Sequence, residues 1–229
     1  MGRSRLLAAA GQININLGSA LHKPSSSVLV ILALAVLTLA PSILILLTGF
    51  TRIVIVLGLT RQALGLTTTP PNQVLVGIAL FISVFLMEPT LSTLNHVALQ
   101  PYLHGHLTAA QAFGRAEVPL KKWMLRQTGR QELALTTRTA HQSGLRPMAD
   151  PLATVVPAFL LTQLKSAFII GFVIFVPFLI VDLVVASTLM SMGIVMLPPT
   201  LVSLPFKLLL FVLVDGWVLV VQSLVTSFR

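Results

Sequence analysis

Cysteine is absent from the 229-residue sequence, and charged residues are scarce. Without cysteine the chain can form no disulfide, thiolate metal site or cysteine nucleophile. Only 9% of the residues are charged, against about 25% in soluble domains. Patterns of the GxSxG, HExxH and P-loop types are also missing, and all five histidines lie outside the long apolar runs. We therefore expect neither an enzyme nor a bound cofactor.

Apolar residues make up 55% of the chain, and the mean hydropathy is +0.95. Such a composition is typical of a membrane protein or of a subunit in a membrane assembly. The net charge of +9 is carried by few, scattered residues. No binding motif or interleaving of basic and aromatic residues accompanies it, so we expect contact with anionic lipid headgroups rather than with nucleic acid.

Four long apolar segments predict an all-α, membrane-associated fold, in which two Pro-broken helical hairpins flank a small helical polar insert. The hairpin turn between the first two segments is expected in GLTTTPPNQ, which is rich in Gly, Thr and Pro. The predicted organisation is an N-terminal arm at 1–27 that is flexible or a signal peptide, a first hairpin at 28–88, an insert at 89–153 and a second hairpin at 154–229 with a Met/Pro turn.

Prolines set the expected helix boundaries. Pro41 should kink or end the first segment, Glu88-Pro89 should end the second, and Pro177 lies within the third. Ser203 and Pro205 resemble an N-cap and a first-turn proline of a final helix that runs to about Ser227.

The insert is expected to contain an amphipathic helix over 118–140, interrupted near Gly129. Leu120, Trp123, Met124 and Gln127 share one side of it, with Lys121, Lys122 and Arg126 elsewhere. His104 and His106 have no third ligand beside them, so we expect no metal site.

Charge in the loops gives an expected orientation. Arg52 and Arg61 lie between the first two apolar segments, which favours the cytoplasm for that region. The insert would then lie on the opposite side, the periplasm in a Gram-negative bacterium. Arg52 is itself flanked by apolar sequence, so it either faces protein or water, or snorkels from a helix end.

Four further charges, Lys165, Asp182, Lys207 and Asp215, lie in or beside apolar sequence. If the second hairpin folds at Pro198-Pro199, both aspartates lie about 24 Å from the turn and Lys207 only about 12 Å, at ~1.5 Å per residue. The lysine and the aspartates are then poorly placed to pair within one chain, and we expect partners from other subunits. Ion pairs that set helix register, a proton relay and a ring of charge facing a pore all remain open.

Methionines gather at the same turn: Met190, Met192 and Met196. They are either ordinary packing residues, since methionine fills irregular gaps, or a soft and deformable seal.

Several strings resemble the FliP family of flagellar type III export-gate proteins, to which injectisome proteins are homologous. They cover most of the chain from about Val28 onward. They are FTRIVIVLGLTRQALG (50–65), PPNQVLVGIALF (70–81), MLRQTGRQELAL (124–135), FVPFLIVDLVVASTLMSMG (175–193) and LPFKLLLFVLVDGW (204–217).

The resemblance implies a pore-forming, non-enzymatic subunit at the flagellar basal body of the bacterial inner membrane. It implies a homo-pentamer with the Q and R subunits, next to other flagellar export apparatus proteins, that passes unfolded flagellar substrates. It places Met190, Met192 and Met196, beside Pro198 and Pro199, in the family's pore gasket.

Two positions depart from the family's pattern. Gly193-Ile194-Val195-Met196 replaces a run of three methionines after the glycine. Gln163 replaces a common acidic residue that is expected to pair with the lysine at Lys207, so a hydrogen bond or a neighbour's aspartate would take over. The inter-subunit polar contacts we expect are those of Gln163, Lys165, Asp182, Lys207, Asp215 and Arg52.

Two other functions compete with the export gate. One is an ion-coupled membrane transporter, suggested by the charges within apolar helices. The other is a structural assembly scaffold without its own pore.

Overall fold

The computed structural model describes residues 31, 34, 35, 38, 45–140, 151–194 and 196–228. The chain divides into two compact units, 1–43 and 44–229. In the first unit the described residues Ile31, Leu34, Ala35 and Thr38 are helical. The expectations for the N-terminal arm and for Pro41 lie outside the described residues.

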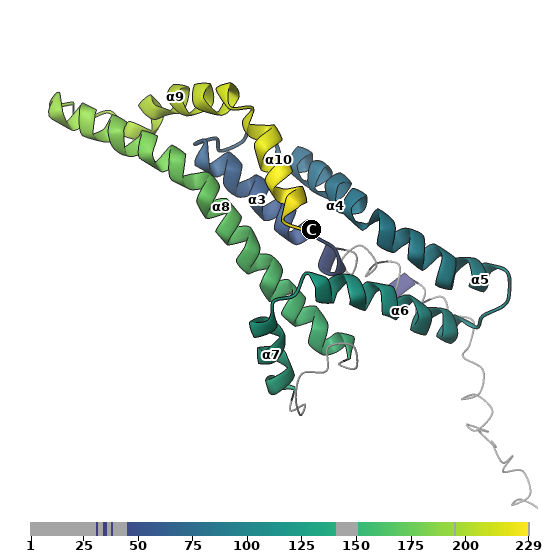
Figure 1. Ribbon diagram of the computed structural model, residues 1–229. Coiled ribbons are helices and arrows are strands. Elements are labelled where there is room, and N and C mark those ends of the chain that lie inside the picture. Colours follow the sequence, from purple (N-terminus) through teal and green to yellow (C-terminus); the bar gives the residue numbers. More distant parts are fainter. Residues whose placement is uncertain are drawn as a thin grey trace, which may run out of the picture. The chain divides into compact units, whose positions relative to one another are not determined.

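The second unit is built from helices, with α8 the longest of those described (Figure 1). In chain order they are α3 (Phe50–Ala63), α4 (Asn72–Leu94), a π-helical turn η1 (Asn95–Leu99), α5 (Gln100–Leu103), α6 (Ala109–Arg126), α7 (Arg130–Thr139), α8 (Leu152–Ser191), α9 (Pro199–Leu213) and α10 (Gly216–Thr226).

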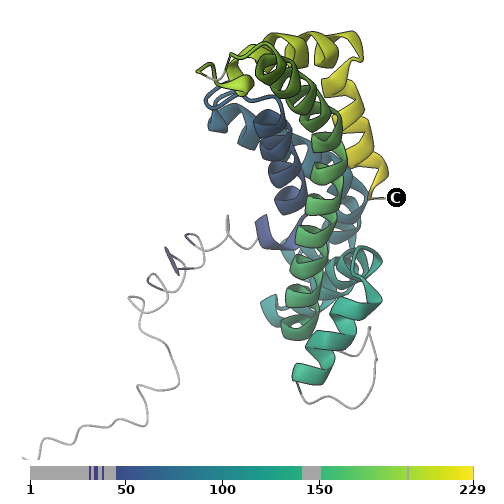
Figure 2. The ribbon, with the colours of Figure 1, turned by 90° about the vertical axis from the view of Figure 1, so that its left-hand side faces the viewer.

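The core forms where α3 packs along α8 (Figures 1 and 2). On α3 the buried residues Ile53, Val56, Leu57 and Thr60 recur every three or four positions, so one face of this helix is covered. Gly171 of α8 is the point of closest approach, because a Cβ there would lie 2.2 Å from Leu59 Cδ1.

The turn between α3 and α4 occurs where the Gly, Thr and Pro residues predict it, which confirms that expectation. Arg61 stabilises it: its Nη1 donates to Pro70 O at 3.0 Å and to Asn72 Oδ1 at 2.7 Å. The chain thus turns back immediately after α3.

Prolines within α4 and α8 do not end those helices, so the boundary expected at Glu88-Pro89 is wrong. The helix α4 continues through Glu88-Pro89 to Leu94, and α8 runs unbroken through Pro157 and Pro177. A proline removes only one intrahelical N–H, and neighbouring turns and apolar packing hold the rest of such a helix together. The prediction that proline breaks the helices of the hairpins is therefore wrong for α8, which is continuous.

The amphipathic helix expected over 118–140 is confirmed as two helices. The first, α6, ends at Arg126, and α7 begins after its N-cap Gly129. Trp123 and Met124 are buried as expected, but Lys121 is buried as well, at 7% exposure. Lys121 lies 3.4 Å from Glu117 one turn earlier, which gives its charge a partner.

The C-terminal region differs from the single helix we expected. The helix α9 begins at Pro199, so Ser203 lies inside it and is not an N-cap. At Asp215 the backbone turns left-handed (φ 50°), and α10 leaves α9 at a bend of 64°. Gly216 is required here, since a Cβ would lie 2.2 Å from the Phe211 ring.

Two helical stretches within the described residues are long and apolar enough to cross a membrane, Asn72–Leu103 with 32 residues and Leu152–Ser191 with 40. A third is added if the bent pair α9 and α10 counts as one span. The first predicted apolar segment lies mostly outside the described residues.

Candidate functional site: the α8–α9 hairpin and its ion pair

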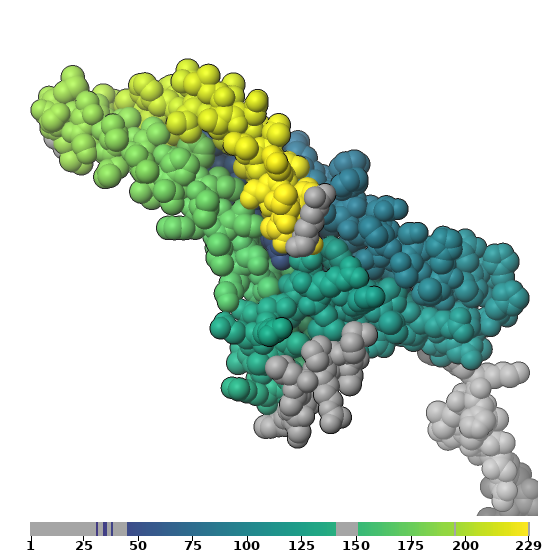
Figure 3. All heavy atoms as spheres, viewed as in Figure 1, coloured from purple at the N-terminus to yellow at the C-terminus, as the bar shows by residue number. Residues whose placement is uncertain are grey.

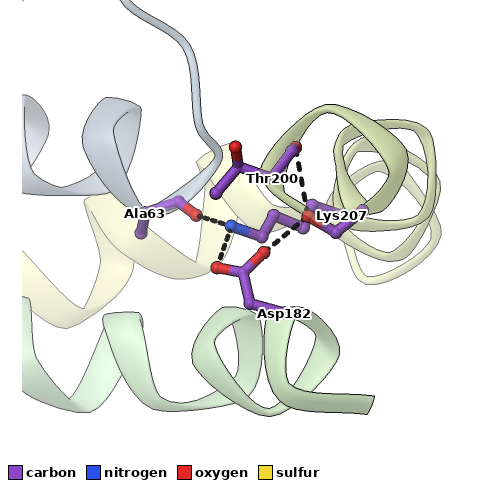
Figure 4. Close-up of polar contacts among 5 residues, drawn as sticks. Ala63, Asp182, Thr200 and Lys207 are labelled. Carbon is purple, nitrogen blue, oxygen red and sulfur yellow. Dashed lines mark hydrogen bonds and ion pairs between the residues drawn. The ribbon is translucent and has the colours of Figure 1, made fainter. Parts of the chain in front are cut away.

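Asp182 of α8 and Lys207 of α9 form an ion pair between the two arms of the hairpin (Figure 4). Lys207 Nζ lies 2.6 Å from Asp182 Oδ2 and donates to Ala63 O, at the end of α3, at 3.1 Å. The Ser203 hydroxyl donates to Asp182 Oδ1. The lysine side chain is 4% exposed and the aspartate 30%, so one end of the pair is buried and the other reaches the surface. The network ties α3, α8 and α9 together.

This pair corrects the depth count made from the sequence. The count placed the hairpin turn at Pro198-Pro199, but α8 ends at Ser191 and α9 begins at Pro199. Asp182 is nine residues before the end of α8, and Lys207 is eight residues after the start of α9. Lys207, and not Asp215, is therefore level with Asp182, and the two pair within one chain.

Three other charged or polar candidates lie far from this pair. Lys165 Nζ binds Glu132 Oε1 of α7 at 2.8 Å. Asp215 is exposed at the break between α9 and α10. Gln163 is fully buried and donates to Gln127 O at 3.5 Å. It precedes Asp182 by 19 residues, about 28 Å along α8, so within one chain Gln163 does not reach the Lys207 with which the resemblance pairs it.

Arg52 is buried at the start of α3, with 3% exposure. Its Nη1 donates to Ser227 O at 2.9 Å and to Ser227 Oγ at 3.0 Å, and its guanidinium lies 4.0 Å above the centre of the Phe228 ring. Burial lowers the pKa of Arg52 to about 10, so the group remains charged at neutral pH. Arg52 thus faces protein, one of the two alternatives left open by the sequence.

The position of Arg52 also weakens the expected orientation. Arg52 lines the same groove as Arg126 and Gln127 of the insert. It therefore lies beside the insert, and it gives no reason to place that end of α3 on the opposite side of a membrane.

The three methionines lie at the end of α8 and in its connection to α9. The end of α8 projects beyond the other helices of this unit (Figure 3). Met190 is 69% exposed, Met192 66% and Met196 96%, so in the single chain they are not core residues. Gly193 takes a left-handed conformation (φ 75°) just after α8, and Pro198 is the N-cap of α9. We call the segment from Met190 to Pro198 the hairpin tip.

An apolar groove of about 520 Å³ lies between α8 and α9 next to the hairpin tip. Val181, Val184 and Leu189 of α8 line it together with Phe206 of α9. The tip and the groove thus form a continuous apolar region with the ion pair at its base.

Ser203 and the Ala63 carbonyl were missed by sequence reasoning. Ser203 precedes Lys207 by four residues, so both lie on one face of α9, a spacing that could have indicated a shared polar contact. The Ala63 carbonyl carries no sequence signal, because it becomes available only where α3 ends beside α9.

Comparison with known proteins gives a consistent result. The sequence model of the FliP family matches residues 33–224. The flagellar biosynthetic protein FliP of Bacillus subtilis is 52% identical over 217 residues, covering 94% of this chain and 98% of that protein. FliP of Caulobacter vibrioides is 48% identical over 222 residues (96% and 84%), and FliP of Aquifex aeolicus 48% over 206 residues (89% and 86%). The resemblance seen in the sequence is confirmed, and the chain belongs to the FliP family.

Proposed function

We propose that this protein is a pore-forming core subunit of the flagellar type III export gate in the bacterial inner membrane. In this role it assembles as a homo-pentamer with the Q and R subunits and passes unfolded flagellar proteins. The observation that carries the proposal is the hairpin tip, which presents three exposed methionines at the end of two apolar helices.

The tip suits a seal. Thioether side chains are flexible and polarisable, so several copies could close around a narrow opening and yield when a chain passes. A seal must also be held at a fixed height, and the Asp182–Lys207 pair does this by fixing the register of α9 against α8. Gly193, Pro198 and Pro199 give the connection a defined course between the two helices.

Assembly is supported by the apolar surface that one chain leaves uncovered. Phe172, Val173 and Leu183 of α8 are 63–70% exposed, and Leu209 and Val212 of α9 are 63% and 73% exposed. Contiguous apolar surface of this kind marks contact with lipid or with other subunits. We propose that the exposed apolar surface of α8 and α9 contacts neighbouring subunits around the pore.

Among the polar candidates, we assign contacts with neighbours to those with exposed side chains. These are Lys165 and Asp215, and the half-buried Asp182 is assigned a contact through the part of its side chain that reaches the surface. Arg52, Gln163 and Lys207 are buried within their own chain and position α3, α8 and α9 from inside. The insert is proposed to lie on the periplasmic side, because Arg61 remains at the α3–α4 turn, at the opposite end of α3 from Arg52 and the insert.

Removal of the seal tests the pore. When the chain is expressed with its partner subunits, deletion of Met192–Met196 should make the membrane leaky to ions, measured as conductance in planar bilayers. Serine at Met190, Met192 and Met196 should give a weaker leak, while leucine at the same positions, similar in size and apolarity, should keep the membrane closed. Stability should change by no more than about 0.5 kcal/mol per site in the serine variant, because these side chains are exposed.

A conductance that stays at the wild-type level after the deletion would refute the seal. The mass of the detergent-solubilised complex separates the alternatives. A discrete homo-oligomer that recruits two small membrane proteins supports the gate, and a stable monomer or dimer that binds a metabolite supports the ion-coupled transporter. An intact oligomer with unchanged conductance in every tip variant supports the scaffold.

A further inference from the structure

A polar groove of about 440 Å³ lies far from the hairpin tip, between the start of α3, the α6–α7 connection and the first half of α8. It is distinct in composition from the apolar grooves elsewhere on the chain. Its polar lining residues are Arg52, Arg126, Gln127, Thr128, Thr162, Ser166 and Ser227.

Arg52 has hydrogen-bonding capacity left over in this groove. Its Nη1 is used by Ser227, but its buried Nε has no hydrogen-bond partner among the described residues. A buried donor on a charged group is costly to leave unpaired. Only 3% of Arg52 is exposed, so this residue belongs to the wall of the groove and is not a surface residue.

In the part of the chain that the structure describes, two neighbouring buried atoms also lack a partner, Trp123 Nε1 and Gln163 Oε1. Trp123 stacks on Phe228, the ring beneath the Arg52 guanidinium. Gln163 binds Gln127, which lines the groove and itself donates to Phe228 O. Among the described residues, five buried side-chain atoms lack a partner; Arg61 Nε and Ser83 Oγ lie elsewhere, and the other three are linked to this groove.

Positive charge predominates at the groove. Arg52 and the exposed Arg126 line it, whereas the nearby carboxylate of Glu132 is already bound by Lys165. The N-terminus of α7 is already occupied, because the Gly129 N–H donates to Thr162 Oγ1 and the Glu132 carboxylate lies beside Gly129. The two guanidinium groups are therefore the part of this groove that favours an oxyanion.

We propose that this groove binds a phosphate group, either in the headgroup of an anionic phospholipid or as free phosphate. Arg52 Nε and the Arg126 guanidinium are its donors. A lipid suits the surroundings because Ile169 and Ile170 of α8 line the same groove, and Ile169 is 57% exposed on a helix able to span a membrane. A headgroup in the groove would place its acyl chains along this apolar surface.

The test uses the full chain, purified in mild detergent and stripped of lipid. Native mass spectrometry measures the binding of phosphatidylglycerol, with zwitterionic phosphatidylcholine as the reference. We expect phosphatidylglycerol to be preferred and Arg126→Gln to lower its affinity about tenfold, the effect of one charge-assisted hydrogen bond. Arg52→Lys, which keeps the charge but loses the guanidinium fork, should weaken binding as well.

Arg115→Gln is the matched control. Arg115 is also an exposed arginine of α6, 11 residues or about 16 Å before Arg126 and on the same side of the helix. It does not line the groove. Its substitution makes the same change of charge and should leave the affinity unchanged.

Competition with inorganic phosphate distinguishes the two sources. Binding that is sensitive to Arg126→Gln and resists phosphate identifies the lipid headgroup, and binding that phosphate displaces with the same sensitivity identifies the free anion. Equal affinities of the wild type and Arg126→Gln, or an equal loss in Arg115→Gln, would overturn the site. Since Arg126 is exposed, this result does not depend on whether Arg52→Lys folds.

Discussion

The two halves of α8 have the same apolar composition but opposite surroundings. Seven of its eight buried residues lie in the first half, from Thr154 to Gly171, and only Phe178 lies in the second. In the first half Lys165 binds Glu132 of α7 and Gly171 meets Leu59 of α3, whereas in the second half Asp182 pairs with Lys207 of α9. In the second half Phe172 is 70% exposed and Leu183 63% exposed.

The difference shows that hydropathy alone does not separate a core helix from an interface helix. Both halves read as membrane-spanning sequence, yet the first half completes the fold of its own chain. The second half leaves its apolar surface for another molecule and is tied back mainly by the Asp182–Lys207 pair. Substitutions in the first half should therefore change the stability of the chain, and those in the second half should change assembly, except at the ion pair.

The ion pair should give the largest effect on stability. Asp182→Asn leaves the Lys207 ammonium buried without a counter-charge, which should lower the free energy of unfolding by about 3 kcal/mol. The measurement is denaturant unfolding of the detergent-solubilised chain. The matched control is Asp215→Asn, which removes an exposed carboxylate, tolerates the left-handed backbone and should change stability by no more than about 0.5 kcal/mol.

A second variant separates pairing within the chain from pairing between subunits. Asp182→Leu combined with Lys207→Met removes both charges and should restore most of the stability. Equal losses in Asp182→Asn and Asp215→Asn would show that the pair does not hold α9 in place. If a Lys207→Ala chain stays stable but no longer forms oligomers, the lysine acts at the interface between subunits and not within its own chain.

The first half of α8 can be tested where it meets α3. Gly171→Val places a branched side chain against Leu59, which a Cβ alone would already approach to 2.2 Å. Overpacking of this kind should cost about 2 kcal/mol in the unfolding free energy. Gly77→Val is the control, because a Cβ at this position of α4 meets no atom within 4 Å. If both valines have the same effect, the close crossing of α3 and α8 is not a source of stability.

Much of the fold could be predicted from the sequence, because its signals are local. The turn after α3 follows from GLTTTPPNQ, and the interruption at Gly129 follows from a glycine between two amphipathic stretches. The all-helical class follows from the length and apolarity of the segments. These features depend on neighbouring residues and need no knowledge of what packs where.

The errors arose where tertiary contacts decide. Pro89 and Pro177 could end a helix by themselves, but they are tolerated because the flanking turns are intact. The pairing of Asp182 with Lys207 was excluded because the turn was placed at Pro198-Pro199, a few residues from its centre. The break at Asp215-Gly216 did have a signal, since Asp-Gly is a turn dipeptide, but the apolar run around it concealed the turn.

The smallest expected effect concerns the contact between α7 and the first half of α8. The hydrogen bond from Lys165, aided by one from the Glu132 backbone N–H, lowers the pKa of the Glu132 carboxyl below its ordinary value of about 4.3. The folded state thus binds this proton less readily than the unfolded chain. The stabilisation is complete above that ordinary value and is lost as the pH falls through the lowered pKa of the folded state.

Because Lys165 is 54% exposed, solvent screens this pair, and Glu132→Gln should cost no more than about 1 kcal/mol at pH 7. Unfolding curves of wild type and Glu132→Gln should differ at pH 7 and converge in acid below the lowered pKa. Glu88→Gln is the control, an exposed carboxylate on α4 without an ion pair among the described residues. A difference that persists unchanged in acid would mean that Glu132 stabilises α8 by packing, and that its ion pair with Lys165 does not contribute.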